Sequence, residues 1–190
     1  KELEYFFEND LYTAGNQIDL HVPFLFDYAD ASWLTQKWVR KILKEPIVQK
    51  YGAHDFFPEP VFDSVYKAIP EGYLEEMDCD YGCMAAWYTM AAMGFYQVCP
   101  GDPVYRLTAP IFKEVSIHLD NTVYEGEKFT VKANNLNDKN IYIHSASLNG
   151  EPLHRSWLNH EEIVKGGELV YEMGPEPNKK WGNSKDIFPK

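Results

Sequence analysis

The hydrophobic pattern of the chain changes near residue 100. Before that point apolar residues recur at helical spacing, as at Trp38, Ile42 and Leu43, opposite a face that carries lysines. After it apolar and polar residues alternate, as at Val115 and Ile117. Alternation with a period of two is typical of a strand with one buried face. The pattern therefore predicts an α+β fold with a helical half followed by an antiparallel β half.

The change of pattern also sets the expected boundaries. We expect helices over residues 1–100, an antiparallel β region over residues 101–175 and a tail over residues 176–190. The turn residues at 99–102 separate the first two parts. An Asn-Gly pair at 149–150 is a strong signal for a β-hairpin.

Smaller signals predict where individual elements begin and end. Ser32 is expected to cap the helix that follows it, and Asn159 with Glu162 forms a capping box for a short helix. The segment 47–71 is rich in Pro, Phe and Tyr, and we expect a loop there with a short helix near 61–68.

Two aspartates precede a segment that is apolar on every side. The run MAAWYTMAAMGF at residues 84–95 has no polar stripe, which predicts a helix buried all round, and it is too short to cross a bilayer. An N-cap role accounts for either Asp78 or Asp80, but less well for the pair, because neighbouring like charges are costly. The helix dipole favours an ionised carboxylate there, which suits a general base. A structural and a catalytic role both remain open.

Composition excludes several classes of partner. The chain has 18 basic and 29 acidic residues and a formal net charge of −11, which argues against nucleic acid and against anionic membrane surfaces. No apolar run is long enough to insert into a membrane. An aromatic content of 15% on an acidic chain suits a neutral polyhydroxylated ligand such as a sugar. Cys79, Cys83 and Cys99 are an odd number without zinc-site spacing, so we expect buried free thiols.

Four stretches, read together, resemble a known family. They are GNQIDLHVPFLFDYA at 15–29, SWLTQKWVRKIL at 32–43, DCDYGCMAAWYTMAAMGFYQVCPG at 78–101 and SWLNHEEIVKGGELVYEMGPEPNKKWG at 156–182. In this order they resemble the C-terminal third of glycoside hydrolase family 92, the calcium-dependent exo-acting α-mannosidases. The resemblance covers nearly the whole chain.

The resemblance carries expectations about fold and function. It implies that residues 1–100 are the last helices of a catalytic (α/α)6 barrel, with the earlier helices and an N-terminal β-sandwich domain lying before Lys1. It implies an inverting α-mannosidase, of α-1,2 type, that removes terminal mannose from glycans during N-glycan degradation. The implied partners are mannose-containing glycans and the preceding part of the same polypeptide, and the implied location is the periplasm or the cell exterior.

The resemblance also assigns site residues. Asp80 corresponds to the general base and Asp78 assists it. Asn16 corresponds to a ligand of calcium, which prefers hard oxygen donors. Gln17 and His21 correspond to sugar-binding positions, although Gly-Asn is also a common turn and a single histidine is often structural.

Departures from the family pattern accompany these assignments. Cys79 stands where the family often has an acidic or polar residue, and Cys83 stands where it usually has a glutamine. The segment between Lys44 and Glu76 is longer than usual, which predicts an extra loop at the site entrance. The family's general acid would precede Lys1, so we expect the chain alone to be inactive.

A noncatalytic carbohydrate-binding or structural module is the alternative function. An acidic, aromatic-rich chain with a β half fits that reading without any role for the aspartate pair. The placement of Asp78 and Asp80 favours the enzyme.

Overall fold

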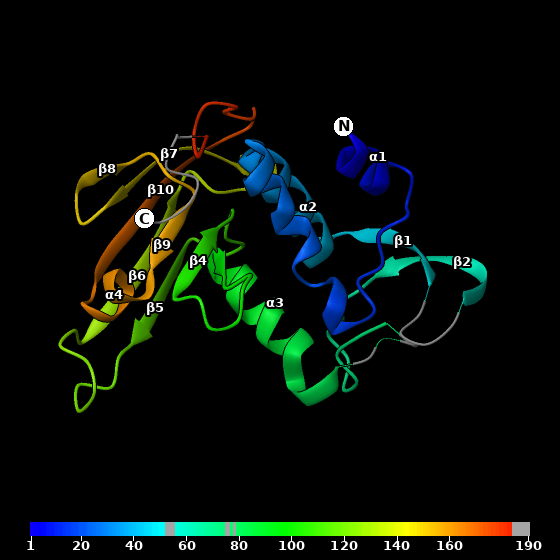
Figure 1. Cartoon of the computed structure of the whole chain (residues 1–190), viewed down its shortest axis with the longest axis horizontal. Coiled ribbons are helices and arrows are strands. Elements are labelled where there is room, and N and C mark those ends of the chain that lie inside the picture. Colours follow the sequence, from blue (N-terminus) through cyan, green and yellow to red (C-terminus); the bar gives the residue numbers. More distant parts are fainter. Residues whose placement is uncertain (52–55, 75–76, 78, 184–190) are drawn as a thin grey trace.

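A computed structural model describes residues 1–51, 56–74, 77 and 79–183 of the chain. Figure 1 shows a two-stranded hairpin at one end of the molecule and a larger β region at the other, with helices between them. The architecture is α+β, in agreement with the sequence pattern.

The helical part consists of short helices, with two strands between the fourth and fifth of them. In chain order they are α1 (Glu2–Glu8), η1 (Gln17–Asp19), η2 (Val22–Ala29), α2 (Ser32–Lys44), η3 (Asp80–Gly82) and α3 (Cys83–Met93), where η marks a 3₁₀ helix. The prediction that Ser32 caps α2 is wrong. Ala31 occupies the N-cap position, and Ser32 is the first helical residue, with its side chain fully buried.

A β-hairpin replaces the loop and short helix that were predicted after α2. Strands β1 (Pro46–Tyr51) and β2 (Phe56–Ser64) pair antiparallel, with Val48 opposite Phe62 and Gln49 opposite Val61. Such aromatic and β-branched pairs stabilise strands through cross-strand contacts. Those contacts join residues far apart in sequence, so local composition did not reveal them.

The β region contains two sheets. A three-stranded antiparallel sheet has the order β3 (Phe95–Tyr96), β4 (Val104–Leu107), β9 (Trp157–Asn159). The five-stranded sheet has the order β5 (Glu114–His118), β6 (Lys128–Asn134), β10 (Gly167–Gly174), β7 (Tyr142–Leu148), β8 (Glu151–Leu153). The first strand of this region, β3, begins before residue 101, earlier than predicted.

The prediction of a purely antiparallel region needs one correction. Strand β10 pairs in parallel with β6 and antiparallel with β7. The chain enters β10 from the short helix α4 (His160–Val164), which lets it run alongside β6 in the same direction. Two local predictions are confirmed: Asn149 and Gly150 form the β7–β8 turn with φ values of 51° and 84°, and Asn159 with Glu162 forms the capping box of α4.

The described residues form two apolar cores, one under the helices and one under the five-stranded sheet. The helical core includes Phe24, Trp38 and Trp87.

Helix α3 buries one side only, because Ala85, Ala86 and Thr89 are exposed, so the prediction of a helix buried all round is wrong for this chain. Among the described residues, no helix is both long enough and apolar enough to cross a membrane.

Candidate active site

Asp80 lies on the tight turn that starts α3. Tyr81 and Gly82 both have left-handed backbone conformations, with φ values of 53° and 77°, and Gly82 N–H donates to the carbonyl oxygen of Cys79 at 3.0 Å. The N-cap of α3 is Gly82, and no side chain among the described residues caps the helix. The capping interpretation therefore fails for Asp80, whose side chain is exposed at the start of the helix. Asp78 lies outside the described residues.

Gln17 joins the first predicted site motif to this turn. Its amide Nε2 donates a hydrogen bond to Asp80 Oδ2 at 2.8 Å, between residues 63 positions apart. Asn16 directly precedes it as the extended N-cap residue of η1 and is half-buried. The structure thus brings the segment that contains Asn16 and Gln17 against Asp80. His21 is exposed at the end of the same segment.

Buried aromatic residues fix the segment that carries Gln17. The Tyr12 hydroxyl donates to the carbonyl oxygen of Asp19 at 3.3 Å, and Trp87 Nε1 donates to that of Leu20 at 2.9 Å. Trp87 belongs to α3, so the same helix anchors both η1 and the turn of Asp80. Sequence reasoning gave Trp87 no supporting role. Its place in the apolar run could have suggested burial but not this long-range bond.

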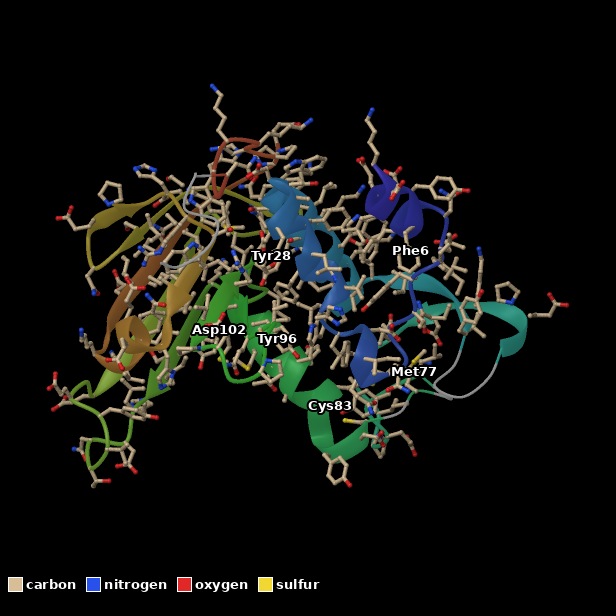
Figure 2. All side chains as sticks on the ribbon, viewed as in Figure 1. Phe6, Tyr28, Met77, Cys83, Tyr96 and Asp102 are labelled. Carbon is tan, nitrogen blue, oxygen red and sulfur yellow. The ribbon has the colours of Figure 1, made fainter. Side chains whose placement is uncertain are left out.

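Tyrosines support the turn from behind. The Tyr73 hydroxyl donates to Cys79 Sγ at 3.2 Å, and the Tyr66 hydroxyl donates to the carbonyl oxygen of Met84 at 3.3 Å. Tyr66 also stacks on Trp87, with ring centroids 5.9 Å apart. Figure 2 shows Cys83 at the start of α3. These contacts hold the residues on both sides of Asp80.

The side chains of Tyr66, Tyr73 and Cys83, which support the residues on either side of Asp80, stay protonated at neutral pH. The hydrogen bond between Tyr73 and Cys79 raises the pKa of Tyr73 to about 12. Burial raises the pKa of Tyr66. Burial, together with the neighbouring Cys79 and Asp80, raises the pKa of the Cys83 thiol. The Cys83 thiol is therefore a neutral group near the Asp80 carboxylate.

Comparison with known proteins identifies the family. The model of the glycosyl hydrolase family 92 catalytic domain matches residues 1–51 and 59–175. The chain belongs to glycosyl hydrolase family 92. The unmatched residues 52–58 fall within the long segment between Lys44 and Glu76 that sequence analysis singled out.

Solved structures of family 92 proteins share this fold. The glycosyl hydrolase ccman5 is 29% identical with a TM-score of 0.88, over 99% of this chain and 26% of that one. The inverting mannosidase BT2199 of Bacteroides thetaiotaomicron is 33% identical with a TM-score of 0.75, over 98% of this chain and 22% of that one. An uncharacterized secreted glycosidase of Arthroderma benhamiae is 29% identical over 98% of this chain and 21% of its own length. The family 92 chain described here therefore spans about a quarter or less of these relatives.

The residues beside Asp80 fit part of a calcium site. Gln17 Oε1 is a buried amide oxygen that accepts no hydrogen bond from any residue that the structure describes, and Asn16 adds a second amide beside it. Within the described ranges, no group of three or more His, Cys, Asp and Glu residues is placed to hold a metal. Calcium takes six to eight oxygen ligands, so two amides would supply a minority of them.

Proposed function

We propose that the chain is the C-terminal portion of the catalytic domain of an inverting, calcium-dependent α-mannosidase. In this proposal the enzyme removes terminal α-1,2-linked mannose from glycans, as in N-glycan degradation, and Asp80 is its general base. The hydrogen bond between Gln17 and Asp80 is the observation that carries the proposal, because it joins two separate family motifs at one place. The solved relative named as an inverting mannosidase supports the reaction class.

Asp80 suits the role of base in its geometry. Inversion requires a carboxylate that takes a proton from the water attacking the sugar. Gln17 Nε2 donates a hydrogen bond to Asp80 Oδ2 and so orients the carboxylate. The second oxygen, Oδ1, is left to accept the proton of the water. Asp78, two residues earlier in the sequence, would assist Asp80, and His21 would contact a sugar hydroxyl.

Asn16 and Gln17 would hold the calcium ion through their amide oxygens. When bound, calcium would supply a positive charge that binds and polarises sugar hydroxyls. Gln17 would then have two roles, since its nitrogen contacts Asp80 and its oxygen would bind the ion.

The remaining part of the catalytic domain would supply the general acid. Glu2 and Glu4 lie in the first turn of α1, and Glu8 lies 3.9 Å from Lys37 Nζ, in an ion pair. None of these contacts ties them to the turn of Asp80. The exposed side of α3 would be covered by that remaining part. The secreted relative supports a location in the periplasm or outside the cell.

The stereochemistry of hydrolysis tests the proposal. The intact enzyme, assayed by NMR on an aryl α-mannoside, is expected to release β-mannose first, and a chelator should abolish turnover until calcium is restored. The 190-residue chain assayed in parallel should release no mannose, because inversion needs two carboxyl groups. α-Mannose as the first product, or calcium-dependent turnover by the 190-residue chain, would contradict the proposal.

A further inference from the structure

A group of buried polar side chains lies where the helical part meets the β region. Asp27 near the end of η2, Ser32 and Thr35 on α2, Arg106 on β4 and Ser156 before β9 are each at most 5% exposed. Figure 2 marks the place by Tyr28, between α2 and the sheets, and the Arg106 guanidinium lies over the Tyr28 ring at 4.2 Å. Polar groups this deeply buried normally have hydrogen-bond partners.

These side chains lie close to one another. Burial raises the pKa of the Asp27 carboxyl to about 8, and the nearby Ser32, Arg106 and Thr35 oppose that rise. A Cβ atom placed on Gly182 would lie 2.7 Å from Ser32 Oγ and 3.0 Å from the Cβ of Ser156, so Gly182 lies directly against both serines.

The direct contacts do not satisfy the polar atoms. Ser32 and Thr35 interact with the Asp27 carboxyl, but neither that carboxyl nor the hydroxyls of Ser32, Thr35 and Ser156 make a hydrogen bond of normal geometry with any residue in the described ranges. A dry arrangement would leave all of these atoms desolvated without compensation. A bound cation is disfavoured by the positive charge of Arg106 nearby. Water remains, because it both donates and accepts and typically makes about three hydrogen bonds when buried.

We propose that Asp27, Ser32, Thr35 and Ser156 enclose ordered water at the junction of α2 with the β region. This water is a permanent part of the fold. It carries hydrogen bonds from η2 and α2 on one side to the residue before β9 on the other. The segment that leads from Gln17 into η2 is thereby fixed relative to the sheets.

The direction in which Tm changes when a buried hydroxyl is removed shows whether that hydroxyl binds water. Thr35→Val keeps the side-chain shape and removes only the hydroxyl. If the hydroxyl binds water, the substitution leaves that water short of a partner, and Tm falls by about 2–4 °C for a chain of this size. If the hydroxyl is dry, its removal relieves an unsatisfied group and Tm rises.

Thr130→Val is the matched control. Thr130 is also buried, and its Oγ1 lies 3.4 Å from Ser116 Oγ, so this substitution reports the loss of a hydroxyl with a protein partner. We expect Thr35→Val to lower Tm as Thr130→Val does. An unchanged or raised Tm for Thr35→Val would overturn the proposal.

A direct observation of the water completes the test. In a high-resolution crystal structure of the 190-residue chain, we expect water within hydrogen-bond distance of Asp27 and at least one of the three hydroxyls. Direct bonds among these side chains, without water between them, would overturn the proposal even if both variants lose stability.

Discussion

Gln17 contacts Asp80 through one half of its amide, while the other half faces inward. The nitrogen donates to Asp80 Oδ2 at 2.8 Å and the buried oxygen Oε1 has no hydrogen-bond partner among the described residues. Sequence reasoning assigned Gln17 to sugar binding through the family resemblance. The contact with Asp80 was not predictable from sequence, because it depends on where η1 and η3 meet in space.

Gln17→Met tests the contribution of this amide at the scale of one residue. Methionine has similar length but donates no hydrogen bond, so the Asp80 carboxylate loses its orientation. At saturating calcium, we expect kcat/KM of the intact enzyme to fall about tenfold, the value of one hydrogen bond of roughly 1.4 kcal/mol. Ile18→Ala is the control, since Ile18 is 69% exposed. Equal activities of the two variants would show that Gln17 does not position the base.

Asp27 makes the stability of the chain depend on pH. Its pKa is raised to about 8 in the folded state, whereas the pKa of an unfolded aspartate is about 3.9. Between these values the unfolded chain loses the proton and the folded chain keeps it. The contribution of Asp27 is therefore fully present below about pH 4 and is lost as the pH rises to about 8.

Asp27→Asn should remove this pH dependence. The urea midpoint of the wild-type chain is expected to fall more between pH 5 and pH 8 than that of the variant. Each unit of pKa shift corresponds to about 1.4 kcal/mol. Burial also raises the pKa of Asp19, but Asp19 is present in both proteins and cancels in the difference. Parallel pH profiles would contradict the assignment to Asp27.

At the scale of elements, the hairpin β1–β2 is tied to the segment before the site. Gln49 is fully buried in β1, and its Oε1 accepts from the Ala14 N–H at 2.9 Å and from the Thr13 hydroxyl at 3.3 Å. The sequence did not reveal this hairpin, because its prolines and aromatic residues favour a loop when read locally. In contrast, the Asn149-Gly150 turn and the capping box of α4 were predictable, since each depends on residues within a few positions of one another.

Gln49→Leu tests that connection. Leucine has similar volume but leaves the buried N–H of Ala14 without an acceptor. An unsatisfied buried donor costs about 1–3 kcal/mol, so we expect the free energy of unfolding to fall by that amount. Val48→Ala, in the half-buried neighbouring position, controls for general weakening of the strand. Gln49→Leu with wild-type stability in a urea titration would show that the contact to Ala14 contributes little.

For the whole molecule, a change of hydrophobic period predicted the order of its parts but not their pairing. The helical part and the β region follow the predicted order, yet α3 exposes one side and β10 enters the sheet in parallel with β6. These features depend on contacts between distant segments, as does the bond between Ile143 N–H and Gln36 Oε1 at 2.8 Å that joins α2 to β7. The meeting of Gln17 with Asp80 belongs to the same class of contact.

The kcat of Asp80→Asn in the intact enzyme tests the account most directly. The amide keeps the size of the carboxylate but accepts no proton from water, so we expect kcat to fall by about 10²–10⁴-fold while the affinity for a mannose-like inhibitor stays near that of the wild type. A kcat within about threefold of the wild-type value would contradict the assignment of Asp80 as the general base.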